Sequence, residues 1–159
     1  MIDQLIKLVK ENAGEQIVKN PAIPDQYNNE AIKISGEEIF NGLKAQVSQG
    51  NVQGLTSFFK TGGSGLAGNP IVTQIISSVA GKFASKFGIS PAIAQQVASA
   101  IVPTVMSKFV SKTNDPKDND FNVSDVMKNL GGSGVGDMLG SLTGGKSGGL
   151  GDALGGFFK

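Results

Sequence analysis

Residues 140–147, GSLTGGKS, match the spacing of a loop that binds nucleotide phosphates, G-x-x-x-x-G-K-[ST]. In such a loop, backbone N–H groups at the start of a helix surround the phosphates, and the lysine, here Lys146, adds a positive charge. That chemistry requires a β-strand before the loop and a substantial helix after it. Here GGSGVGDML precedes Gly140, and the twelve residues after Ser147 include five glycines. We therefore interpret the match as a coincidence of glycine-rich composition.

The acidic stretch DPKDNDFNVSDV suggests a second kind of chemistry, the binding of calcium. Counted from Asp118, Asp120 and Asn122 stand at the third and fifth positions of an EF-hand loop. The sixth position is Val123 instead of glycine, and the twelfth is Asn129 instead of glutamate. We therefore expect a solvated loop, with weak calcium binding as the less favoured alternative.

The residue types that most often do chemistry are missing from this sequence. Its 159 residues include no histidine and no cysteine, and all 14 cationic residues are lysine. Catalytic triads, Cys–His pairs and the usual zinc sites are thereby excluded. We expect no enzymatic activity, no metal and no cofactor. The net charge of +1 argues against a nucleic-acid partner, and the lack of cysteine fits a cytoplasmic location.

Three further features bear on location and packing. The uncharged stretch 87–107 is diluted by two prolines and by glutamine, serine and threonine, so we expect a buried helix there and no transmembrane segment. The N-terminal residues have neither the basic region nor the apolar run of a signal peptide. The single tyrosine, Tyr27, is expected to be a half-buried packing residue.

Apolar residues recur at helical spacing in the second half of the chain. One helix is expected up to Phe87, with Gly88 as its C-cap, and the next begins with Ser90 as N-cap and Pro91 at its first position. Pro103 interrupts this second helix, so we expect a kink or break near Val102. The apolar stripes of the two helices comprise Ile71, Ile75, Val79, Phe83 and Phe87, and Val97, Ile101, Val105 and Phe109.

The first half is more polar but has the same pattern. A helix is expected on the stripe formed by Ile2, Leu5, Ile6 and Val9. After a loop with two prolines, helices are expected over residues 25–47 and 52–59, and in the second half a third helix over 123–130. No segment alternates like a β-strand. The sequence therefore predicts an all-α fold.

Four segments recur in the same order at offsets of about 70 residues, which indicates an internal duplication. MIDQLIKLVK corresponds to IVTQIISSVA, and GNVQGLTSFF to FNVSDVMKNL. We expect two tandem three-helix units, at 1–60 and 70–130, joined by a glycine-rich connector, 61–69. A unit of about 60 residues is marginal alone, so both units are expected to share one core. A chance likeness between amphipathic helices is the alternative.

The glycine-rich tail, 131–159, carries short amphipathic segments. VGDMLGSL and LGDALGGF repeat the shape of VSDVMKNL, residues 123–130, with apolar residues at positions one, five and eight on one helical face. We expect self-association through the apolar residues of this tail, which are Leu139, Leu142, Leu150, Leu154, Phe157 and Phe158.

Residues 71–159 resemble the YidB-like proteins and neighbouring bacterial families of unknown function. The resemblance is carried by GISPAIAQQVASAIVPTVMSKF and by the tail GDMLGSL…GLGDALGGFF. It implies an all-helical fold and supplies no catalytic residues.

We therefore predict a non-enzymatic protein that self-associates or acts as a scaffold, forming homo-oligomers or filaments through its apolar faces and its tail. The alternative is a binding module for a lipid, a small apolar ligand or a partner helix. Such a ligand would lie in a groove between helices lined by small residues, namely Ala80, Gly81, Ala84, Ala94, Ala98 and Ala100.

Overall fold

The computed structural model describes residues 1–62, 65–119 and 121–131, and within these residues the chain is all-helical, as predicted. These described residues form one short 3-10 helix, η1, and six α-helices. Their bounds are α1 (Ile2–Val18), η1 (Asp25–Tyr27), α2 (Asn28–Ser48), α3 (Val52–Lys60), α4 (Pro70–Phe87), α5 (Pro91–Thr113) and α6 (Val123–Gly131).

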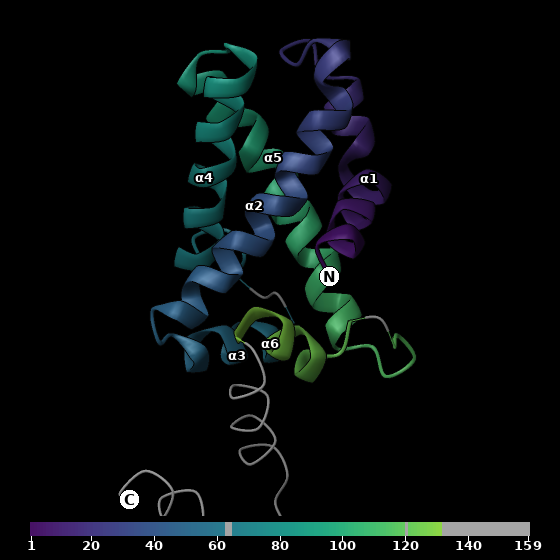
Figure 1. Cartoon of the computed structure of the whole chain (residues 1–159), viewed down its shortest axis with the longest axis vertical. Helices are drawn as coiled ribbons and strands as arrows, with labels where there is room; N and C mark the ends of the chain where they lie inside the picture. Colours follow the sequence, from purple (N-terminus) through teal and green to yellow (C-terminus); the bar gives the residue numbers. More distant parts are fainter. Residues whose placement is uncertain (63–64, 120, 132–159) are drawn as a thin grey trace, which may run out of the picture.

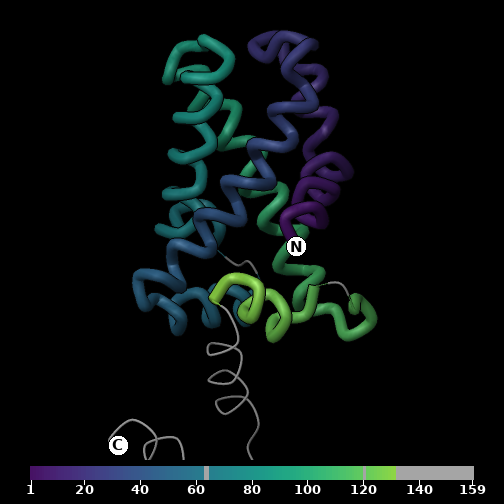
Figure 2. Tube along the Cα trace, in the orientation of Figure 1, coloured from purple at the N-terminus to yellow at the C-terminus, as the bar shows by residue number. Residues whose placement is uncertain are grey.

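Four long helices form the body of the molecule, and two short ones lie at one end of it (Figure 1). α1 packs against α2 and α5, and α4 packs against α5 and α2. The trace in Figure 2 shows that α1 and α2 run in opposite directions, as do α4 and α5. The loops that follow α1 and α4 lie at the end of the body opposite to α3 and α6.

One continuous apolar core joins all six α-helices. Leu5, Ile39, Ile75 and Ile101 are fully buried, one from each of the four long helices. At the end occupied by the short helices, the ring of Phe109 in α5 makes edge contacts with Phe59 in α3 and with Phe121 before α6, at centroid distances of 5.6 and 5.3 Å.

The corner between α4 and α5 forms as its sequence predicts. Gly88 ends α4 in the left-handed conformation, at φ 66°, which a residue without a side chain adopts at little cost. The hydroxyl of Ser90 accepts a hydrogen bond from the N–H of Ile93, and Pro91 occupies the first turn of α5. Asn69, for which the sequence analysis gave no role, caps the start of α4 by accepting from the N–H of Ile71.

Of the kink or break expected near Val102, the break is wrong, because α5 continues through Pro103 from Pro91 to Thr113. Both apolar stripes that flank the proline are buried, including Ile101, Val102 and Val105 at 0% exposure. Burial of this much apolar surface outweighs the cost of an interior proline, about 3 kcal/mol, which combines the lost hydrogen bond with the clash between the proline ring and the preceding turn.

Other helix ends differ from the prediction by a few residues. The first three residues of the helix expected over 25–47 form η1 instead, directly before α2. Gly131, which was assigned to the tail, is the last residue of α6.

Candidate functional site

The tail residues predicted to mediate self-association, Leu139, Leu142, Leu150, Leu154, Phe157 and Phe158, lie outside the described residues. The same is true of the phosphate-loop match at residues 140–147. The candidate sites that the structure describes all lie in the helical body.

A half-apolar cleft, here called the end groove, opens at the end of the body opposite to α6. It has a volume of about 430 Å³ and lies between the loop after α1 and the first half of α5. Ile93 in its wall is 41% exposed, whereas Val97 is buried. The lining residues are Asn20, Pro21, Ala22, Ile93, Gln96, Val97 and Ala100.

The end groove has the composition of a surface that holds an apolar group. Ile93, Val97 and Ala100 are spaced at i, i+4 and i+7 on α5, and Gln96 lies among them. A carboxamide beside an aliphatic floor can orient an apolar ligand or helix through its hydrogen bonds. Of the small residues expected to line a groove, Ala100 lines this one, whereas Ala94 and Ala98 are fully buried in the core.

A second cleft, the amide cleft, lies where α2, α3 and α4 meet and has a volume of about 280 Å³. Gln46, which is 6% exposed, donates from Nε2 to Oε1 of Gln74 at 2.7 Å. Its own Oε1 accepts from Nδ2 of Asn51 at 2.8 Å. The amide of Gln46 is thus satisfied by protein groups, and the network fixes the end of α2 to the neighbouring helices rather than presenting free donors to a ligand.

Sequence reasoning did not find the amide cleft. Its one available signal was Gln46, a polar residue that falls next to Leu43 and Val47 on the core-facing side of α2. The partner Gln74 is 28 residues away in the chain, so the pairing could not be deduced from local spacing.

The described residues of the loop considered for calcium binding make structural contacts, and Asp120 lies outside the described residues. The carboxylate of Asp118 accepts from Nζ of Lys112 at 2.9 Å. Asn122 accepts from the N–H of Asp125 and donates to the Asp125 carboxylate, which makes it the cap of α6. Within residues 1–62, 65–119 and 121–131, no group of three or more histidine, cysteine, aspartate or glutamate residues is placed to hold a metal ion.

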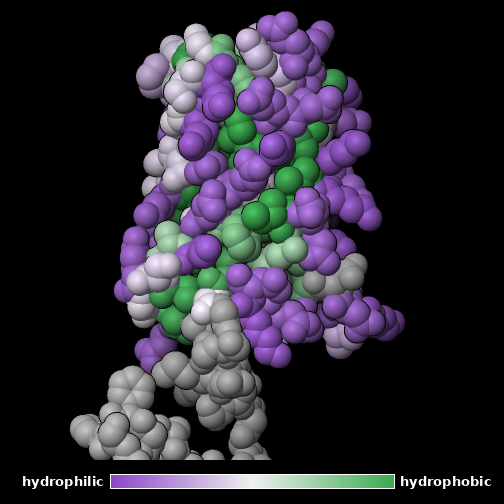
Figure 3. All heavy atoms as spheres, in the orientation of Figure 1, coloured by the Kyte–Doolittle hydropathy of each residue, from purple (hydrophilic) through white to green (hydrophobic). Residues whose placement is uncertain are grey.

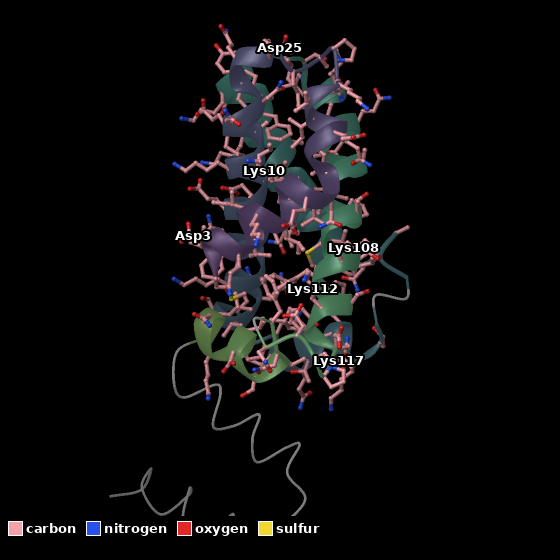
Figure 4. The ribbon with its side chains drawn as sticks, turned by 90° about the vertical axis from the view of Figure 1, so that its right-hand side faces the viewer. Asp3, Lys10, Asp25, Lys108, Lys112 and Lys117 are labelled. Atoms are coloured by element: carbon pink, nitrogen blue, oxygen red, sulfur yellow. The ribbon has the colours of Figure 1, made fainter. Side chains whose placement is uncertain are left out.

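Charged side chains are distributed over the outside of the described body, and Asp115, Lys117 and Asp118, which line one cleft in the loop after α5, carry opposite charges. Figure 4 shows Asp25 at one end, Lys117 at the other, and Lys10 and Lys108 on different helices between them. Tyr27 is half-buried, as predicted, and its ring stacks on Phe87 at a centroid distance of 5.0 Å. The described surface therefore offers apolar and amide contacts more readily than a cluster of reactive groups.

None of the helices in the described part of the chain combines the length and apolar character needed to cross a membrane. In particular, α5 contains most of the uncharged stretch 87–107 and is a buried helix of the body, as expected.

A scan against protein-family models and searches of curated proteins and of solved structures find no match to this chain.

Proposed function

We propose that this chain is a non-catalytic protein that associates with copies of itself, head to tail, by placing the tail segment 150–158 of one copy in the end groove of the next. The proposal extends to a cytoplasmic location, which the lack of cysteine in the whole sequence supports. We also propose that residues 71–159 are related to the YidB-like proteins. The residues that carry this resemblance include the Gly88–Pro91 corner between α4 and α5.

The observation that carries the proposal is the packing of α6. Met127 and Leu130, at positions five and eight of VSDVMKNL, are 0% and 3% exposed, and Val123 at position one is partly buried against the core. The same spacing occurs twice more after Gly131, and its last occurrence is Leu150, Leu154 and Phe157. Because α6 packs on the helical body with this spacing, a tail segment with the same spacing is suited to pack on the body too.

Distance permits a groove on another copy. The end groove and Gly131 lie at opposite ends of the body (Figure 1), and the α5 residues that line the groove, Ile93 to Ala100, precede the end of α5 at Thr113 by roughly 20–30 Å of helix. A flexible linker as long as the stretch from Gly131 to Leu150 has a root-mean-square extension of about 24 Å. A contact within one chain would hold this linker at about its root-mean-square extension, whereas a contact between copies places no such constraint on it. Repeated head-to-tail contacts produce rings or filaments.

The test is the mass of the particle in solution, measured by sedimentation velocity. The full chain should associate, and a chain ending at Gly131 should be monomeric. Ile93→Asn in the exposed wall of the groove and Leu154→Asp in the tail should each abolish association. Leu139→Asp, a matched change in the earlier tail segment, should preserve it.

Mixing the two defective variants gives a sharper test. Ile93→Asn retains a competent tail and Leu154→Asp retains a competent groove, so an equimolar mixture should form dimers and nothing larger. A full chain that stays monomeric at high micromolar concentration contradicts the proposal.

An internal duplication is part of the same proposal, and equivalent positions support it. The contact between α1 and α2 corresponds to the contact between α4 and α5. In the same way, the contact between α1 and α5 corresponds to the contact between α4 and α2. Paired positions have matching burial: Val9 and Val79 are both fully buried, as are Leu43 and Phe109. The short helices α3 and α6 each have nine residues, and each begins at the valine of an Asn–Val dipeptide, at 51–52 and 122–123.

A second candidate function is the binding of a lipid or other small apolar ligand in the end groove. The volume of about 430 Å³ and the aliphatic residues on its α5 wall favour it. Native mass spectrometry of the purified chain should then reveal a bound species that Ile93→Asn removes. A groove that serves only as a protein docking site would give the mass of the chain alone.

A further inference from the structure

The face of the molecule on which α1 crosses α2 has exposed apolar side chains. In the space-filling view, hydrophobic residues gather in a diagonal band over these two helices (Figure 3). Ile2 is 36% exposed, and Ile6 and Phe40 are partly buried against the core. We call these three residues the α1–α2 seam.

The geometry of the crossing explains why the three seam residues lie near one another. At Gly36, an added Cβ would lie 2.9 Å from both the Cα and the N of Ile6, so the backbones of α1 and α2 are in close contact there. The two helices run in opposite directions. Ile2 lies one turn before Ile6 on α1, and Phe40 lies one turn after Gly36 on α2. Because the helices are antiparallel, both residues lie on the same side of the crossing.

The seam extends toward α6 and therefore toward the start of the tail. α6 packs on α2, and Phe40 is eight residues, or about 12 Å of helix, before the end of α2 at Ser48. Leu139 follows Gly131 by eight residues. A flexible chain of that length has a root-mean-square extension of about 16 Å, which is comparable with the separation it must cover.

We propose that residues 135–142, VGDMLGSL, dock on the α1–α2 seam of their own chain. The segment repeats the spacing with which α6 packs on the body, and its residues Val135, Leu139 and Leu142 occupy positions one, five and eight. It is preferred over 150–157 because the effective concentration of a tethered group falls with linker length, here by a factor of roughly four. This contact within one chain does not depend on the proposed self-association.

Docking would divide the tail into two parts with different roles. The first segment covers apolar surface beside α6, and the second, 150–158, remains available to another copy. Because the first contact fixes the tail to the body, it would also determine the point from which the second segment departs.

The absence of native cysteine allows a direct test by pulsed electron paramagnetic resonance. Spin labels are attached at Lys44→Cys, an exposed position one turn beyond Phe40, and at Ser141→Cys, which is outside the apolar positions of the segment. The proposal predicts a narrow distance distribution. Leu139→Asp should broaden it to that of a free tail, and Leu154→Asp should leave it unchanged.

The same readout tests the seam without disturbing the core. Ile2→Ser removes an exposed seam residue and should broaden the distribution, whereas Val18→Ser, at a 52% exposed position on the other end of α1, should not. An excess of unlabelled protein should leave the distribution narrow, because the contact is within one chain. A broad distribution in the otherwise unaltered chain, a narrow one that survives Leu139→Asp, or one lost on dilution with unlabelled protein overturns the inference. If the chain forms no oligomers but the distance distribution is narrow, the proposed function is wrong and this inference stands.

Discussion

The side-chain amide of Asn114 donates a hydrogen bond of 2.7 Å to the carbonyl oxygen of Phe59, 55 residues earlier in the chain. The same nitrogen also donates to the carbonyl of Val110, at 2.9 Å. Asn114 directly follows α5 and Phe59 lies in the last turn of α3. One amide therefore satisfies carbonyl groups at the ends of two helices from different halves of the sequence.

Asn114→Asp should destabilise the protein by about 1–3 kcal/mol, because it replaces a shared donor with a carboxylate that faces two carbonyl oxygens. Asn119→Asp is the matched control, since Asn119 is exposed in the following loop and its substitution adds the same charge. The measurement is urea-induced unfolding followed by circular dichroism. Equal effects of the two substitutions would show that charge, and not the hydrogen bonds, is responsible.

Gly36→Ala should destabilise the protein by about 1–3 kcal/mol despite the higher helix propensity of alanine. The added methyl group would lie 2.9 Å from backbone atoms of Ile6, and a backbone cannot move aside as a side-chain tip can.

Gly81→Ala provides the control for that substitution, because Gly81 is exposed in α4 and a methyl group added there would have no neighbouring atom within 4 Å. Here only helix propensity acts, and the free energy of unfolding should rise by about 0.5–1 kcal/mol. Thermal unfolding of both variants should therefore shift in opposite directions; shifts of the same sign would contradict the close crossing of α1 and α2.

Gln46→Leu should destabilise the protein by about 1–2 kcal/mol, through loss of the hydrogen bonds to Gln74 and Asn51. Gln49→Leu, at an exposed position one turn away in the sequence, should change stability by no more than about 0.5 kcal/mol. Chemical denaturation measures both. A neutral Gln46→Leu would mean that the amide network contributes no net stability.

Asn122→Ala should destabilise α6 by about 1 kcal/mol, because the side chain of Asn122 caps the N–H of Asp125. Ser124→Ala should have little effect, since Ser124 is exposed in the first turn of α6. Hydrogen exchange of the α6 amides distinguishes the two, with faster exchange expected only in Asn122→Ala. The reverse result would make Ser124 the cap.

The sequence predicted features that depend on neighbouring residues. The apolar stripes of α4 and α5, the Gly88 and Ser90 caps and the short helix α6 all follow from spacing within one or two turns, and all are present. The start of α6 was expected to involve Ser124 or Asp125, whereas the structure uses Asn122 as the cap, with Asp125 as its partner.

Features that depend on distant packing were not predicted. The proline rule predicted a kink or break near Val102, and the buried surroundings of α5 override the break. Gly36 has no local signal that sets it apart from other helix positions, and only its contact with α1 gives it a role. The end groove joins residues about 70 apart in the chain, such as Asn20 and Ile93, and no local pattern indicates that pairing.

The contact of α1 with α5 has a consequence for the protein during its synthesis. α1 can pack on α2 once both have been made, but its second partner, α5, is complete only at Thr113. Until then the side of α1 that packs on α5 faces water or another protein. Nascent chains that stop before α5 should thus be substrates for chaperones and proteases, and release of those helpers should coincide with the emergence of α5.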